Sequence, residues 1–175
     1  KQKRNLIWLI LYFQGEPFLN KDFFKMVAHA RSQKIFTSTS TNGHFLTPQK
    51  ADETVKSGLD RIIISLDGLD QQTYEQYRVG GNFNQVMAGI KNLVAARKKL
   101  KASNPLIVVQ FIVFKFNENQ ISKAKALKNE LGVDKVEIKT AQIYSDNDKN
   151  QLIPADSKYA RYSQTAEGLW KIKKP

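Results

Sequence analysis

The run Arg61-Ile62-Ile63-Ile64-Ser65-Leu66-Asp67-Gly68 decides the fold of this chain, because an apolar, β-branched segment stops in it and a polar cluster follows at once. The same pattern recurs along the chain, with amphipathic helical stretches between the repeats. The other polar clusters are Gln14-Gly15-Glu16-Pro17, Thr39-Ser40-Thr41-Asn42-Gly43, Lys115-Phe116-Asn117-Glu118 and Lys139-Thr140-Ala141-Gln142. Strands that alternate with helices run parallel, so these polar ends meet at one edge of one sheet. Ligands of open α/β sheets and barrels bind at that carboxyl edge, where we place the functional site.

The composition is that of an ordinary globular domain. The chain has 175 residues, 41% hydrophobic and 25% charged, which suits one domain with its own core. No apolar run approaches the roughly 18 residues of a membrane span, so we expect a cytoplasmic protein with no membrane partner. Cysteine is absent and only His29 and His44 are present, which excludes thiolate chemistry in this chain and predicts no metal site.

The net charge of +12 raises the question of a polyanionic partner. The lysines are spread over predicted helix surfaces, and no pattern of interleaved aromatic and basic residues accompanies them. We therefore attribute the positive charge mainly to lysines on solvated helix faces and do not expect a nucleic acid as the partner. An electrostatic role toward an anionic ligand stays open.

Hydrophobic patterning predicts about five parallel strands with flanking helices. The predicted strands cover 5–13, 34–39, 61–66, 106–114 and 136–140. The first is apolar almost throughout, which favours a strand covered on both faces. Helix caps are predicted at Asn20, Thr47, Asp70 and Asn117. Residues 141–175 lose the periodicity and are expected to be irregular, with at most one short helix.

Two polar clusters contain side chains with binding chemistry. Gly15 lets a backbone approach a ligand closely, Pro17 fixes the next turn, and bare carbonyls beside Glu16 suit an ammonium group. Ser65 and Asp67 share one face at a strand end, where a hydroxyl and a carboxylate suit a ribose diol. Taken alone, each cluster is better explained by ordinary turn and capping chemistry.

Three further residues are weaker candidates. Arg78, just before a Gly-Gly break, is suited to bidentate pairing with a carboxylate. Thr39 and Asn42 lie at the end of the second predicted strand, where turn chemistry explains them equally well. His44 has no acidic or nucleophilic partner nearby in the sequence and is interpreted as a surface histidine. Catalytic residues are not assigned.

Taken in order, these clusters resemble the radical S-adenosylmethionine (SAM) enzymes, and in particular the branch of Fe–S oxidoreductases that carries a SPASM domain after the barrel. The resemblance rests on Gly-Glu-Pro, then Thr-Asn-Gly, then Ser-Leu-Asp-Gly followed by Tyr77-Arg78 and Asn82-Phe83. It covers residues 6–140. The segment from Leu152-Ile153-Pro154 to Tyr162 resembles the connector before the auxiliary domain.

The resemblance implies a partial (β/α)6 TIM-like barrel that binds SAM. Gln14-Gly15-Glu16-Pro17 stands where the family has Gly-Gly-Glu-Pro, whose backbone and glutamate hold the methionine amino group. Glutamine replaces the first glycine here. By the same resemblance, Ser65 and Asp67 would lie beside the ribose or the carboxylate of SAM, and Arg78 would bind the carboxylate. Thr39 and Asn42 would line the mouth of the same site. The implied cofactor-binding residues are Gly15, Glu16, Pro17, Thr39, Asn42, Ser65, Asp67 and Arg78.

The family's three-cysteine motif, which binds a [4Fe–4S] cluster, is absent from this chain. We therefore expect an internal fragment, with residues 1–142 as strands two to six of the barrel and 143–175 as a connector toward a missing auxiliary-cluster domain. The parent enzyme would cleave SAM reductively to a 5′-deoxyadenosyl radical and abstract a hydrogen atom from a peptide or sugar substrate. The fragment alone would be inactive, and its exposed strand at residues 5–13 would promote self-association.

Two alternatives remain at this stage. The first is a cysteine-free α/β domain that binds a nucleotide or sugar without radical chemistry. The second is a basic module that binds RNA. Cysteines upstream in the parent gene would exclude the first, and RNA binding with a steep salt dependence would favour the second.

Overall fold

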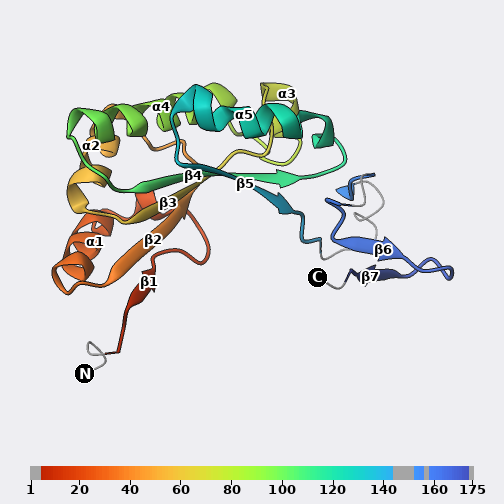
Figure 1. Ribbon diagram of the computed structural model, residues 1–175, viewed down its shortest axis with the longest axis horizontal. Helices are drawn as coiled ribbons and strands as arrows, with labels where there is room; N and C mark the ends of the chain where they lie inside the picture. The colour runs from red at the N-terminus through yellow and green to blue at the C-terminus, as the bar shows by residue number, and fades with distance from the viewer. Residues whose placement is uncertain (1–4, 144–151, 156–157, 174–175) are drawn as a thin grey trace.

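The computed structural model describes residues 5–143, 152–155 and 158–173 (Figure 1). Its core is a five-stranded sheet in the order β1-β2-β3-β4-β5, and every neighbouring pair in it is parallel. The strands are β1 (Trp8–Ile10), β2 (Phe36–Thr41), β3 (Arg61–Ser65), β4 (Leu106–Val113) and β5 (Lys135–Thr140). The predicted fold class, a partial barrel of parallel strands with flanking helices, is confirmed.

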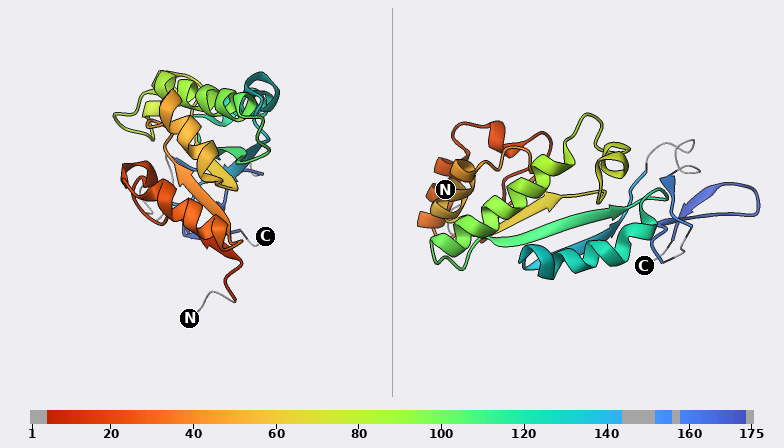
Figure 2. Two further views of the ribbon diagram at one scale, coloured as in Figure 1. Left: turned by 90° about the vertical axis from the view of Figure 1, so that its left-hand side faces the viewer. Right: turned by 90° about the horizontal axis from the view of Figure 1, so that it is seen from above.

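The helices cover one face of the sheet, and the opposite face is concave and open (Figure 1, Figure 2). They are α1 (Phe23–Ser32), α2 (Pro48–Ser57), α3 (Gln71–Glu75), α4 (Phe83–Lys99) and α5 (Ile121–Leu131), with single 3-10 turns at η1 (Pro17–Leu19) and η2 (Glu118–Gln120). Alternate residues of each strand pack beneath them; in β3, Ile62 and Ile64 are fully buried. Among the described residues, no helix combines the length and apolar character that crossing a bilayer requires.

Two of the predicted helix caps, Thr47 and Asp70, lie where they were predicted. Thr47 Oγ1 accepts a hydrogen bond from the Lys50 amide at 3.2 Å and begins α2, which ends at Gly58 with φ +77°. Asp70 Oδ1 accepts from the Thr73 amide at 2.8 Å and begins α3. The prediction for Asn20 was wrong, since α1 begins after Asp22 and Asn20 Oδ1 instead accepts from the Asp22 amide.

The first strand is shorter and far more exposed than predicted. Only Trp8–Ile10 pairs as strand, and Ile7 and Phe13 are 81% and 92% exposed. The cause is its place in the sheet: β1 is an edge strand that pairs with β2 alone among the described strands. The prediction that both of its faces are covered was therefore wrong, and self-association through this edge stays a prediction.

The described part of the C-terminal segment forms an antiparallel hairpin, not the irregular structure predicted. Its strands are β6 (Tyr162–Gln164) and β7 (Trp170–Ile172). The Tyr162 hydroxyl donates to the Ile143 carbonyl at 3.1 Å and accepts from the Ile143 amide at 3.0 Å, which attaches the hairpin to the chain after β5. A separate apolar cluster includes Tyr162, Ile143 and Phe114.

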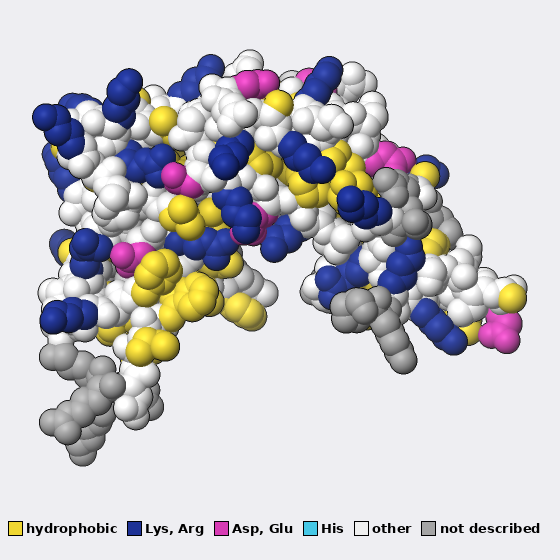
Figure 3. Space-filling view, viewed as in Figure 1, with side chains coloured by type: hydrophobic (Ala, Val, Ile, Leu, Met, Phe, Trp, Pro, Cys, Tyr) yellow, Lys and Arg dark blue, Asp and Glu magenta, His cyan; other side chains and the backbone are white. Residues whose placement is uncertain are grey.

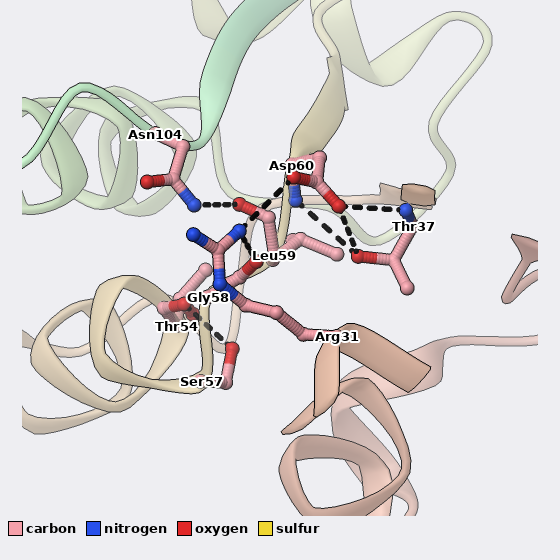
Figure 4. Close-up of polar contacts among 8 residues, drawn as sticks. All are labelled: Arg31, Thr37, Thr54, Ser57, Gly58, Leu59, Asp60 and Asn104. Atoms are coloured by element: carbon pink, nitrogen blue, oxygen red, sulfur yellow. Dashed lines mark hydrogen bonds and ion pairs between the residues drawn. The ribbon is translucent and has the colours of Figure 1, made fainter. Parts of the chain in front are cut away.

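A polar network closes the amino edge of the sheet (Figure 4). Asp60 Oδ2 accepts from the amide and the hydroxyl of Thr37, at 2.8 and 3.0 Å, and Asp60 Oδ1 accepts from Arg31 at 3.2 Å. Arg31 also donates to the Gly58 carbonyl at 3.1 Å. A Cβ on Gly58 would lie 2.1 Å from Arg31 Cδ, so a side chain here would displace Arg31 from the network, and the positive φ also favours glycine. The network joins α1 to the starts of β2 and β3.

Replacing Asp60 with alanine should lower the free energy of unfolding by about 2–3 kcal/mol, because the donors of the buried Thr37 lose their acceptor. Urea unfolding followed by circular dichroism measures this change. As a control, Asp22→Ala removes an exposed aspartate whose one ion-pair partner among the described residues is Lys25, and we expect a change within about 0.5 kcal/mol. Equal losses in the two variants would contradict the structural role of Asp60.

Candidate functional site

A cavity of about 350 Å³ opens at the carboxyl edge of the sheet. Its volume lies within the ~300–1,000 Å³ typical of small-molecule sites. Loops and strand ends that are far apart in the sequence contribute to its wall. The lining residues are Tyr12, Gly15, Glu16, Ser40, Thr41, Asn42, Ser65 and Arg78. Glu16, Ser65 and Arg78 thus converge on one cavity, as the argument from parallel strand ends requires.

Glu16 fastens the loop after β1 to the end of β2. Its Oε1 accepts from the Thr41 hydroxyl at 2.8 Å and from the Phe18 amide at 3.2 Å, and its Oε2 accepts from the Asn42 amide at 2.8 Å. Both carboxylate oxygens are therefore engaged by the protein. The geometry gives Glu16 a positioning role: it fixes the turn that presents the backbone at Gly15 to the cavity.

Gly15 leaves the wall of the cavity open. It has φ +82°, and a Cβ built on it meets no atom within 4 Å. Glycine is therefore required here for its backbone conformation, while the space beside it stays free for a ligand. Pro17 opens the 3-10 turn that follows and does not line the cavity.

Asp67 is fully buried beneath the cavity, where it binds Arg78. Its Oδ2 lies 2.6 Å from Arg78 Nη2 and 2.8 Å from Arg78 Nε, and its Oδ1 accepts from the Ile112 amide at 2.9 Å. Burial raises the pKa of Asp67, and the guanidinium and this amide act in the opposite direction. The placement of Asp67 beside a ligand was wrong, because its oxygens are turned inward to position Arg78.

Thr39 was also assigned to the wrong surface. It is fully buried on the face that the helices cover, where its hydroxyl donates to the Leu11 carbonyl at 3.2 Å. The alternation of a strand places Ser40, not Thr39, on the concave face with Ser65. Sequence reasoning missed Ser40, although the same period of two that paired Ser65 with Asp67 would have found it.

Asn117 holds the ends of β3 and β4 together. It stands at the predicted N-cap position, before η2, but its side chain makes no capping hydrogen bond. Its Nδ2 donates to the Asp67 and Ile112 carbonyls, both at 2.9 Å, and its Oδ1 accepts from the Phe114 amide at 2.8 Å. It is fully buried. Both polar atoms of the side chain are therefore engaged, and one of the bonds holds the Asp67 carbonyl.

His44 is partly exposed, in keeping with its interpretation as a surface histidine, and it bridges two loops. Its Nε2 accepts from the Asn82 amide at 2.9 Å, and its Nδ1 lies 3.2 Å from Asn42 Oδ1. A donor at Asn82 requires the neutral imidazole with its proton on Nδ1. The contact orients Asn42 at the rim of the cavity. In the described part of the chain, no group of three or more His, Cys, Asp or Glu side chains is arranged to hold a metal ion.

Comparison with known proteins gives concordant results. The model of the radical SAM superfamily matches residues 1–128. PqqA peptide cyclase of Gluconobacter oxydans is 28% identical over 155 residues, which span 87% of this chain and 42% of that protein. Pre-heme d1 synthase of Dinoroseobacter shibae is 30% identical over 143 residues, which span 81% of this chain and 33% of that protein. The chain thus covers less than half the length of these relatives.

Solved structures share the fold. SuiB of Streptococcus suis bound to S-adenosylmethionine superposes with a TM-score of 0.65 at 16% identity, over 82% of this chain and 32% of SuiB. The same protein bound to its precursor peptide SuiA gives a TM-score of 0.61, also at 16% identity and over the same shares of the two chains.

The ion pair between Asp67 and Arg78 should show strong coupling in a double-mutant cycle. Asp67→Asn leaves the half-buried guanidinium without its counter-charge, and we expect a loss of about 2–3 kcal/mol in the free energy of unfolding. Combined with Arg78→Gln, the losses should fall short of additivity by at least about 1 kcal/mol. Chemical denaturation of the four proteins measures the coupling. Additive losses would show that the two residues act independently.

Proposed function

This chain belongs to the radical SAM superfamily, and we propose that its carboxyl-edge cavity binds the cofactor SAM within a longer enzyme that modifies a peptide. The observation that supports this proposal is the convergence of Gly15, Ser65 and Arg78 on one cavity of suitable size. The family match favours it over a cysteine-free nucleotide- or sugar-binding domain and over a basic RNA-binding module.

The lining residues suit the polar parts of SAM. Arg78 Nη1 has no hydrogen bond to any described residue, so it is free to donate to the cofactor's carboxylate. The open backbone at Gly15 suits the ammonium group. The hydroxyls of Ser40 and Ser65 would bond the carboxylate or the ribose, with Asn42 at the rim. Thr39 and Asp67 are buried behind the lining residues, where they bind Leu11 and Arg78, and would not touch the cofactor.

The second family cofactor, a [4Fe–4S] cluster, has no ligands in this chain, because no residue is a cysteine. When both cofactors are bound, their chemistry is the reductive cleavage of SAM and abstraction of a substrate hydrogen by the resulting radical. We propose that residues 1–142 contribute the central part of the barrel and that 143–175 connect it to an auxiliary-cluster domain of the SPASM type. The role of this chain is to bind and orient.

A peptide is the proposed substrate class. PqqA peptide cyclase is named for a peptide, and SuiB has been solved with the precursor peptide SuiA. In this chain the concave face of the sheet adjoins the cavity and is not covered by helices (Figure 2). An extended chain lying there would bring a side chain to the reacting end of the cofactor.

The gene product that contains this chain should form 5′-deoxyadenosine from SAM after anaerobic reconstitution with iron and sulfide and reduction with dithionite. Chromatography of the quenched reaction detects this product. Absence of 5′-deoxyadenosine from a protein with a full complement of iron would refute the radical reaction.

Arg78→Lys should weaken binding of SAM to the 175-residue chain about tenfold, because one ammonium group cannot pair with Asp67 and also reach the cofactor's carboxylate. Equilibrium dialysis with labelled SAM measures the affinity. Arg31→Lys is the matched control, since Arg31 is also held by an aspartate, Asp60, but at the opposite edge of the sheet. The proposed site is wrong if the two variants bind SAM equally.

A further inference from the structure

A cluster of charged side chains lies on the concave face, outside the cavity but on strands that lead to it. Along β5, Val136 and Ile138 pack into the apolar layers beneath the helices. Strand alternation therefore turns Lys135, Glu137 and Lys139 to the opposite, concave face. All three of the β5 side chains on the concave face are thus charged, where a barrel interior would otherwise be packed with apolar side chains.

The cluster is aligned with the proposed SAM site. Ser65 is the register partner of Gln110, and Gln110 is the register partner of Glu137. Register partners in a parallel sheet present their side chains to the same face. Two strand spacings separate Ser65 from Glu137, a distance of roughly 10 Å. A peptide held at β5 would therefore lie beside the cofactor.

One carboxylate receives three cations in this cluster. Glu137 Oε1 lies 2.9 Å from Lys135 Nζ and 3.2 Å from Arg61 Nη2, and Glu137 Oε2 lies 3.3 Å from Lys139 Nζ. Hydrogen bonds from Lys135 and Lys139 lower the pKa of Glu137, so it is ionised at neutral pH. The group then carries a net charge of +2, the sum of three positive charges and one negative.

The excess positive charge is accessible to a ligand. The Glu137 side chain is only 11% exposed, but those of Lys135 and Lys139 are 60% and 52% exposed. In the space-filling view, Lys and Arg side chains surround an acidic one beneath the helices (Figure 3). A purely structural role for Glu137 would need only one cationic partner, because each additional cation is repelled by the cations already there. Glu137 therefore holds two ammonium groups together at the surface.

We propose that Lys135 and Lys139 bind a carboxylate of the substrate, so that the enzyme selects a peptide with an acidic residue near the modified position. This inference rests on the proposed function and defines its substrate more closely. Arg61 anchors Glu137 from β3, so that Glu137 acts as a positioning residue. A nucleic acid would need a track of several phosphate contacts and stacking aromatics, whereas β5 offers one pair of lysines and no aromatic side chain.

The test uses the isotopically labelled 175-residue chain and two short alanine-based peptides, one with two glutamates and its twin with two glutamines. In NMR titrations, the glutamate peptide should shift the amides of β5 and bind at least about fivefold more tightly than its twin. In Lys135→Gln/Lys139→Gln this preference should disappear. Lys125→Gln/Lys128→Gln is the control, because it removes the same charge from the exposed face of α5 and should retain the preference.

Three outcomes would overturn the inference: equal binding of the two peptides by the wild-type chain, an equal loss of preference in both double variants, or tighter binding of oligothymidylate than of the glutamate peptide at β5. Dialysis with SAM on the same samples separates this inference from the proposed function. A wild-type chain that binds SAM but does not distinguish the peptides refutes only the acidic substrate. A chain that does not bind SAM refutes the proposed site itself.

Discussion

The carboxyl edge of this fold depends on one buried carboxylate. Asp67 has no contact with solvent, and a charge in that position is tolerated only because the protein supplies donors to both of its oxygens. Those donors come from Arg78 and from the backbone of β4. Asn117 binds the Asp67 carbonyl and closes the arrangement from behind. The hydrogen bonds that stabilise the Asp67 charge thus fix the spacing between the ends of β3 and β4. They also fix the direction in which Arg78 points beside the cavity.

The strands and helix caps that form through residues close together in the chain could be predicted from the sequence. The isoleucine run of β3 and the caps at Thr47 and Asp70 follow from periodicity and from hydrogen bonds within one turn. The length and burial of β1 could not be predicted, because the exposure of a strand depends on what lies beside it in the sheet. The role of Asn117 was equally inaccessible, since one of its partners is Asp67, fifty positions away in the sequence.

The same distinction explains which site residues were identified. Gly15 and Ser65 were found because strand ends in a parallel sheet share an edge, and Arg78 because it precedes a Gly-Gly break; each of them lines the cavity. Thr39 and Asp67 are polar and also lie at or near strand ends, but they face the other way. Residue type shows that a polar group is present at a strand end. Only the direction of the side chain shows whether it serves a ligand or the protein, and that direction depends on strand register and on distant donors.

The hydrogen bonds among Arg31, Thr37 and Asp60 lie at the end of the sheet opposite the cavity. Because this network joins α1 to the starts of β2 and β3 independently of the cavity, exposed loop positions at the carboxyl end can change with little effect on it. Such a division of labour favours evolutionary divergence of specificity on an unchanged framework. Directed evolution of this chain would accordingly be most productive if it left the residues at the amino edge of the sheet unchanged.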